Sequence, residues 1–404
     1  MKLSNLIVVK NDKEVTREDI YLADGKFADK YKTDNIISFQ DAVAYPSFIN
    51  VHDHLIGNWL PLAGLNRPYP NSNIWVEDMK NSFSFKERDK YWTNDGSFNL
   101  LKGNGLEMAM LGVYKNIFSG ITIVQDHIPK QDDRYYESFP IEVIRNYHQV
   151  HSITLNNWWG GNSLEKEFSL CNEHTPFIIH LAEGTDKISK SEFAKLKKMI
   201  PLRNNILLVH CVAFDRDDFQ EIKRNDVNIA WCPESNFYLL DKTLDIYTVI
   251  DLQINVSIGT DSTMSGSINL FSELRFIKDR FPDISPRIIF RMVTSNPAKA
   301  LKLKDYSGKI EKGQQANLLI TSIKSNDPYE NILGLYSSDI HLMLYQGKPI
   351  LGLKKYLCHF NVIPEEYYFY TKNGKEYFVI GHPERILAHI EQCLGYKKKF
   401  AFLP

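Results

Sequence analysis

The sequence contains few cysteines, and no two of them form a CxxC pair. Their number is odd, and they are scattered along the chain at Cys171, Cys211, Cys232, Cys358 and Cys393. A disulfide framework needs paired cysteines, so this usage favours reduced thiols in a cytoplasm. The opening stretch MKLSNLIVVKNDKEV reaches charged side chains too soon for a signal peptide. We therefore expect a cytoplasmic protein.

A basic excess and a long apolar run are also missing. The chain has 48 lysines and arginines against 49 aspartates and glutamates, which gives a formal net charge of −1. Proteins that bind nucleic acid or anionic membranes in general carry a basic excess, so neither partner is expected. No stretch approaches the roughly 18 uninterrupted apolar residues of a membrane span. The 404 residues are 43% hydrophobic, as in a soluble globular protein with one large domain or two moderate ones.

Short apolar runs recur through the middle of the chain, each followed by residues with helical periodicity. They begin roughly 20 to 30 residues apart, which is the repeat of βα units that build a parallel sheet. The first 45 residues and those after about 304 instead alternate apolar runs with polar turns, a pattern typical of antiparallel strands. The sequence predicts an α/β protein with a (β/α)8 TIM-like barrel. Its expected strands include PSFINVHDH, GITIVQDH, HSITLNNWW, PFIIHLAEG, NILLVHCVA, VNIAWCPESN and INVSIGTDS.

Metal-binding or proton-transferring side chains stand at the ends of five of these runs. Residues i and i+2 of a strand share a face, so His52 and His54 should project together while Asp53 turns away. A parallel barrel carries its chemistry on the rim formed by the carboxyl ends of its strands. A lone HxH is explained equally well by packed histidines, but five such strand ends indicate a site. The side chains are His52, His54, Asp126, His127, His180, Glu183, His210 and Asp261.

These residue types suit a catalytic metal centre. Such a centre takes three or four nitrogen or oxygen ligands, leaves a position for water, and brings the pKa of that water near neutral. His52, His54, His180 and Asp261 are candidate ligands from separate strands. Glu183 has the type and spacing of a proton shuttle, and His210 is suited to polarise a substrate or hold the water. From the residues alone, Glu183 as an exposed helix residue and His210 as a core histidine stay open alternatives.

Several motifs resemble, in order, the strand-end motifs of the amidohydrolase superfamily. They are PSFINVHDHL, HLAEG, LLVHCV, CPESN and IGTDS, and the resemblance continues through INLFSELRF and TSNPAKALKL over roughly residues 1–350. The branch is that of mononuclear cytosine/guanine deaminases and chlorohydrolase-like enzymes. The resemblance implies one divalent metal and not two, because no strand end offers the lysine that binuclear members carbamylate. Zinc is expected as that metal in preference to iron.

The resemblance also implies a role for each site residue. His52, His54, His180 and Asp261 become metal ligands, with Asp261 also assisting the attacking water. Glu183 becomes the shuttle that protonates the ring nitrogen and then the leaving ammonia. His210 becomes the residue that stabilises the tetrahedral intermediate or orients the water.

The resemblance divides the chain into a hydrolase barrel at 48–304 and a small β-sandwich at 1–47 and 305–404 with a C-terminal extension. One region departs from it. Only 54 residues separate Asp126 from His180, where two βα units are expected and one strand, SITLNN, is evident. Either a strand is hidden in 135–150, or the barrel is distorted or lacks one βα unit.

The expected function is that of an aminohydrolase acting on a small molecule. A metal-activated water attacks a ring carbon of a compact nitrogen heterocycle, and ammonia leaves. A cyclic amide hydrolase and a chlorohydrolase-type enzyme stay open, because the same site serves them; a non-catalytic scaffold would have lost its ligands. A homodimer is an expectation by analogy. The loop tryptophans either wall a pocket for a planar ring or pack the loops: Trp59, Trp75, Trp158 and Trp159.

Overall fold

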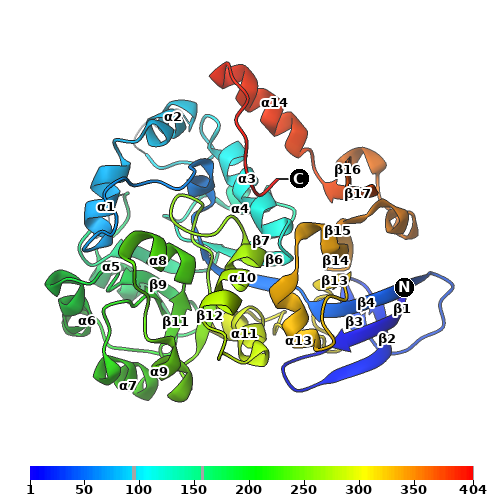
Figure 1. Ribbon diagram of the computed structural model, residues 1–404, viewed down its shortest axis with the longest axis horizontal. Coiled ribbons are helices and arrows are strands. Elements are labelled where there is room, and N and C mark those ends of the chain that lie inside the picture. The colour runs from blue at the N-terminus through cyan, green and yellow to red at the C-terminus, as the bar shows by residue number, and fades with distance from the viewer. Residues whose placement is uncertain (93–96, 156–158, 404) are drawn as a thin grey trace.

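Parallel strands from the middle of the chain form two sheets in the computed structural model, which describes residues 1–92, 97–155 and 159–403 (Figure 1). One sheet has the order β5-β6-β7 and the other the order β12-β11-β10-β9-β8. The pairings within both are parallel. The α/β class is therefore confirmed. The strands are β5 (Phe48–Asp53), β6 (Ile121–Asp126), β7 (Glu142–Val143), β8 (His148–Ser152), β9 (Phe177–Leu181), β10 (Ile206–His210), β11 (Asn228–Trp231) and β12 (Val256–Ile258).

Helices follow most of these strands, and their sequences explain where they begin. In α7 (Arg216–Arg224), Asp215 accepts hydrogen bonds from the first-turn N–H groups, and Phe219 and Ile222 are buried beneath a charged outer face. The others in this part are η1 (Leu55–Trp59), α1 (Ser72–Met79), α2 (Phe83–Trp92), α3 (Gly105–Ile117), α4 (Asp133–Glu137), α5 (Leu164–Leu170), α6 (Lys187–Met199), α8 (Pro233–Leu240), α9 (Ile246–Asp251), α10 (Leu270–Arg280), α11 (Pro286–Met292) and α12 (Ser295–Ala300).

The short segment between Asp126 and His180 holds two strands and not one. Of the alternatives left open for this segment, a strand hidden in 135–150 is present as the two-residue β7, which pairs with β6. β8 follows after residues 144–147, which form no helix, so a helix is missing here and not a strand. The expected strand over SITLNN is wrong beyond Ser152, because residues 153–155 form a turn; residues 156–158 lie outside the described part. The described part of the chain thus has eight parallel strands in two sheets.

Both chain ends contribute to a separate nine-stranded sheet, seen at the right of Figure 1. Its order is β16-β17-β15-β14-β13-β4-β1-β2-β3. Neighbouring residues of β4 serve two cores, since Val43 and Tyr45 pack against the parallel strands and Ala42 and Ala44 face away. The strands are β1 (Lys2–Val9), β2 (Val15–Ala23), β3 (Lys26–Ala28), β4 (Ile36–Pro46), β13 (Leu318–Ser322), β14 (Ile340–Tyr345), β15 (Lys348–Leu353), β16 (Tyr367–Lys372) and β17 (Lys375–Ile380).

The C-terminal extension joins this sheet and then leaves it. Asn373 and Gly374 have positive φ and turn β16 into β17, which is the hairpin geometry that an Asn-Gly pair favours. The stretch PERILAHIEQCL forms α14 (Pro383–Leu394), which packs against α3 (Figure 1). The remaining helices are α13 (Pro328–Asn331) and the short 3-10 segments η2 (Ile332–Gly334), η3 (Ser337–Asp339), η4 (Lys354–His359) and η5 (Pro364–Glu366).

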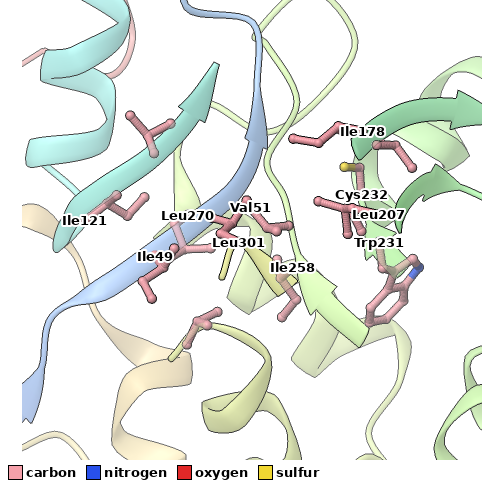
Figure 2. Close-up of a cluster of buried hydrophobic side chains, with 14 of the residues drawn as sticks. Ile49, Val51, Ile121, Ile178, Leu207, Trp231, Cys232, Ile258, Leu270 and Leu301 are labelled. Atoms are coloured by element: carbon pink, nitrogen blue, oxygen red, sulfur yellow. The ribbon is translucent and has the colours of Figure 1, made fainter. Parts of the chain in front are cut away.

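The main core lies among the parallel strands. Every residue of β5, β6, β9 and β10 is buried, as expected for strands covered on both faces. Figure 2 shows Val51 of β5 and Leu207 of β10 within one apolar cluster. No described helix is both long and apolar enough to cross a membrane.

Candidate active site

The six residues predicted for the site come together at the carboxyl ends of the parallel strands. His52 lies in β5 and His54 follows it, His180 lies in β9, and His210 ends β10. Glu183 and Asp261 stand just after β9 and β12. Five of the six line one cavity, and His52 is buried behind it.

Three imidazole nitrogens converge in the arrangement that a metal ion requires. Nε2 of His180 lies 3.2 Å from Nε2 of His52 and 3.3 Å from Nε2 of His54. Asp261 Oδ1 lies 3.9 Å from Nε2 of His54. Zinc–nitrogen bonds of about 2.0–2.1 Å in a tetrahedron place neighbouring nitrogens about 3.3–3.4 Å apart. The donor set therefore fits a divalent cation of zinc's size.

The histidines are held in the neutral form that binds metals. Nδ1 of His180 lies 2.9 Å from the carbonyl oxygen of His151, so Nδ1 donates its proton and the lone pair of Nε2 faces the cluster. Burial, followed by the neighbouring imidazoles, lowers the pKa of His52 and His180 well below the usual range. Burial also lowers the pKa of His54, although Asp261 opposes this shift.

Asp261 is fixed as an ionised carboxylate. Its Oδ1 accepts the N–H of Ser262 at 2.7 Å, and its Oδ2 accepts the hydroxyls of Ser235 at 2.9 Å and Ser265 at 3.1 Å. Burial alone would raise the pKa of Asp261, but His54, His210 and the hydrogen bonds from Ser262 and Ser235 lower it. Its φ of 52° is a left-handed backbone conformation that few non-glycine residues adopt. The chain thus holds a strained position here to aim this carboxylate.

Glu183 and His210 face each other across the cavity. Oε1 of Glu183 lies 3.5 Å from Nε2 of His210. Nδ1 of His210 lies 2.8 Å from Oδ1 of Asn236, and Nδ2 of Asn236 donates to Thr243 Oγ1 at 3.0 Å, which fixes the amide. Burial, more than any other cause, raises the pKa of Glu183. A carboxyl with a raised pKa suits a group that both takes and returns a proton.

Asp53, between the two histidines, points away from them as strand alternation predicts. Its carboxylate lies 3.3 Å from Nζ of Lys115 and accepts the amides of Asn116 at 2.9 Å and Asn58 at 3.0 Å. Lys115 also donates to the carbonyl oxygen of Asp261. α3 therefore links the first and last strand ends of the site through a buried ion pair.

Sequence reasoning named His127 at a strand end but gave it no role, and it missed His151, Ser235 and Asn236. His127 places its ring 4.4 Å from that of His180, and one of its nitrogens belongs to the same cluster of possible ligands. His151 lines the cavity. Ser235 and Asn236, which orient Asp261 and His210, belong to the quoted motif CPESN, so its polar residues were the available signal. His127 ends an expected strand, whereas His151 has no spacing pattern that marks it.

The remaining cavity wall is mainly apolar and comes mostly from the loops and helices after β5, with Ile128, Trp159 and Met264 from the segments after β6, β8 and β12. Of the four loop tryptophans, Trp75 and Trp159 line the cavity. Trp59 is buried and stacks on Tyr91 with ring centroids 4.6 Å apart. Trp158 lies outside the described residues. Other wall residues are Ile56, Gly57, Ser72, Val76, Met79, Phe85, Arg88, Phe98, Ile128 and Met264.

Comparisons with known sequences identify a family and related enzymes. The sequence pattern of the Amidohydrolase family matches residues 162–355. The chain is 25% identical to 5-methylthioadenosine/S-adenosylhomocysteine deaminase of Pyrococcus horikoshii, over 86% of this chain and 93% of the relative.

Solved structures share the fold. A zinc-bound adenosine deaminase of Xanthomonas campestris matches with a TM-score of 0.68 and 16% identity, over 97% of this chain and 98% of that one. Atrazine chlorohydrolase of Arthrobacter aurescens, complexed with zinc, matches with a TM-score of 0.69 and 18% identity, over 97% and 99%.

Proposed function

We infer that this chain, which belongs to the amidohydrolase superfamily, is a metal-dependent aminohydrolase that releases ammonia from an amino-substituted nitrogen heterocycle. The observation that carries this inference is the convergence of three imidazole nitrogens, Asp261, Glu183 and His210 at one cavity. The curated relative named above is a deaminase, which agrees with the reaction. We propose zinc as the metal, because zinc is bound in both solved structures and the nitrogen spacing fits it.

In this proposal His52, His54, His180 and Asp261 hold the cation. When bound, the cation lowers the pKa of a water so that it is a nucleophile near neutral pH. Glu183 takes a proton from that water and delivers it to the ring nitrogen beside the carbon under attack. The water oxygen forms a bond to the carbon that bears the amino group. The second proton of the water, now on the hydroxyl of the tetrahedral intermediate, passes through Glu183 to the amino nitrogen, the carbon–nitrogen bond breaks, a carbonyl forms, and ammonia leaves.

His210 and Asp261 have supporting roles in the same step. Asn236 accepts from Nδ1 of His210, so Nε2 is directed at the cavity, where it accepts a hydrogen bond that orients the water or, with both ring nitrogens protonated, donates to the oxygen of the tetrahedral intermediate. Asp261 uses its second oxygen for the hydroxyls of Ser235 and Ser265, which holds the first oxygen toward His54. The apolar wall excludes bulk water from the reaction.

We further propose that the two parallel sheets belong to one distorted (β/α)8 barrel. Backbone N–H groups of Thr260 and Asp261, after β12, donate to the carbonyl of His52 in β5, which supports contact between the sheets on that side. In this proposal 48–304 is the hydrolase barrel, and 1–47 with 305–404 is the β-sandwich and extension. The five cysteines are free thiols, which supports a cytoplasmic location. A homodimer stays a proposal by analogy.

The test is a product assay on a panel of amino-substituted purines, pyrimidines and triazines. We expect ammonia from at least one ring, loss of that activity with a chelator, and its return with zinc. Release of halide from chlorinated triazines in place of ammonia would support the chlorohydrolase alternative, and ring opening of cyclic amides would support the amide hydrolase. Ammonia release that survives complete metal removal would contradict the proposal.

A further inference from the structure

A fourth imidazole lies against the three histidines proposed as ligands. His127 follows β6, and its backbone N–H donates to the carbonyl oxygen of Asp53 at 2.8 Å. Its ring centroid lies 4.4 Å from that of His180, 5.2 Å from that of His52 and 5.6 Å from that of His54. The side chain is fully buried and, like that of His52, does not line the cavity. His127 is therefore placed to meet the proposed ligands and not a substrate.

The backbone of β8 orients this ring in the same way that it orients His180. Nε2 of His127 lies 3.3 Å from the carbonyl oxygen of Val150, and Nδ1 of His180 lies 2.9 Å from the carbonyl oxygen of the next residue, His151. A carbonyl oxygen can only accept, so in each ring the nitrogen beside the carbonyl carries the proton. Histidines that bind metals are held in this way by a carbonyl or a carboxylate. His127 thus has the support that a metal ligand has.

The other nitrogen of His127 has no partner. A buried imidazolium beside three other imidazoles is strongly unfavourable, so the ring is neutral and Nδ1 carries a lone pair. Within the described residues, this buried Nδ1 makes no hydrogen bond. Buried polar atoms in folded proteins are satisfied by a protein group, a water or an ion. One nitrogen of His127 lies within 4.8 Å of a nitrogen of each of His52, His54 and His180, so a cation at these histidines is in reach.

We propose that His127 is a fourth histidine ligand of the cation, bound through Nδ1. The possible donors form two groups that share His52: the four histidines form one, and His210 and Asp261 belong to the other. A fourth imidazole favours zinc and other metals that bind nitrogen over magnesium, calcium and manganese, which prefer oxygen ligands. This inference rests on the proposed function, because it adds a ligand to the metal centre of that reaction.

The test measures the binding of zinc and of cobalt(II) to the purified protein. Wild type is compared with His127→Phe, which keeps a ring without a nitrogen, and with His127→Gly, to which imidazole is added as a replacement ligand. The surface control is His174→Phe, whose parent side chain is 76% exposed. The zinc Kd is measured by competition with a chelator, and the visible spectrum of each cobalt(II) protein is recorded. Thermal unfolding shows that each variant is folded.

We expect His127→Phe to bind zinc more than about 100-fold more weakly than wild type, because removing a group that only supports a ligand costs about 10- to 100-fold. The visible bands of its cobalt(II) form should intensify, since fewer ligands surround the ion. Added imidazole should restore the affinity and the spectrum of His127→Gly, and His174→Phe should match wild type.

A smaller loss of zinc affinity in His127→Phe, an unchanged cobalt(II) spectrum, or no response of His127→Gly to imidazole would overturn the inference. If any of these results accompanies ammonia release by the zinc-loaded wild type, the inference fails and the proposed function stands. If zinc binding and the spectrum depend on His127 but no compound of the panel yields ammonia, the proposed function fails while the ligand stands. A wild type that binds neither metal would overturn both.

Discussion

Nε2 of His210 lies 3.5 Å from Oε1 of Glu183, and Nδ1 of the same imidazole is bound to Asn236. The amide oxygen of Asn236 accepts from Nδ1, so the proton on this ring is committed to the side away from the cavity. Nε2 can then accept a hydrogen bond from the water, the substrate or a protonated Glu183. The orientation of His210 thus depends on a residue that contacts no ligand in the proposed reaction.

Asn236→Ala should therefore impair catalysis without removing the metal. Loss of the oxygen that holds Nδ1 frees the imidazole to rotate, and we expect kcat to fall by roughly 10- to 100-fold. Steady-state kinetics and elemental analysis of the same preparation check this. The exposed Asn361→Ala is the matched control. A variant with unchanged kcat would show that Asn236 does not position His210.

Glu183→Gln should remove the proton shuttle and leave the shape of the cavity intact. We expect kcat to fall by about 10²- to 10⁴-fold with metal content unchanged. The wild-type pH profile gives a second check. Burial raises the pKa of Glu183 above 4.5, and the carboxylate must be ionised to accept a proton, so kcat/KM should fall with decreasing pH at a point above pH 4.5. A variant that retains half of the activity would exclude Glu183 as the shuttle.

We predict that Glu192 in α6 makes the free energy of unfolding depend on pH. Burial raises its pKa to about 7 from an ordinary 4.5, although the N–H of Ala182 and the hydroxyl of Thr154 donate to it. The folded state disfavours the ionised form, so the wild type should lose up to about 3 kcal/mol of stability as the pH rises from 4.5 through 7. Glu192→Gln has no such loss, so its free energy of unfolding should rise relative to that of wild type from pH 5 to pH 8.

Urea unfolding at pH 5 and pH 8 measures this pH dependence. It is carried out on wild type, Glu192→Gln and the exposed control Glu391→Gln. The free energy of unfolding of Glu192→Gln minus that of wild type should be larger at pH 8 than at pH 5. The same difference for Glu391→Gln should not change with pH. A difference that is the same at both pH values would show that Glu192 is not ionised at a cost in the fold.

The C-terminal tail should stabilise the cavity wall. Lys398→Met leaves the nearly buried Glu87 without its cation, and breaking such a pair costs roughly 3–5 kcal/mol, so we expect a lower free energy of unfolding and a higher KM. The adjacent, exposed Lys397→Met should change neither. Denaturant unfolding and steady-state kinetics check both quantities. If Lys398→Met and Lys397→Met have the same free energy of unfolding and the same KM, the tail does not stabilise the cavity wall.

The residues at strand ends were predictable because two local rules apply to them. Alternation along β5 placed His52 and His54 on one face, and the common direction of parallel strands placed His180, His210 and Asp261 on the same rim. The α/β class followed from the spacing of the apolar runs. These features depend on short stretches of sequence, so no knowledge of long-range packing was needed.

Other features depend on packing that leaves no local pattern. β7 has two residues, too few to show any periodicity, and it exists because β6 offers it an edge. His151 lies in β8, whose sequence HQVHS is mostly polar, and it shows no motif spacing. The contact of Lys398 with Glu87 joins residues 311 positions apart in a tail whose sequence has no recognisable pattern. Arg88 was likewise one charged residue among several on α2.

Metal content of the purified wild type and of Asp261→Ala tests the central claim most directly. Elemental analysis of the wild type should give about one zinc or other divalent metal per chain, as expected for three histidines and one carboxylate. Asp261→Ala should bind the metal more weakly and lose ammonia release with it. A wild-type protein that contains no metal, and gains none with zinc, would contradict the account.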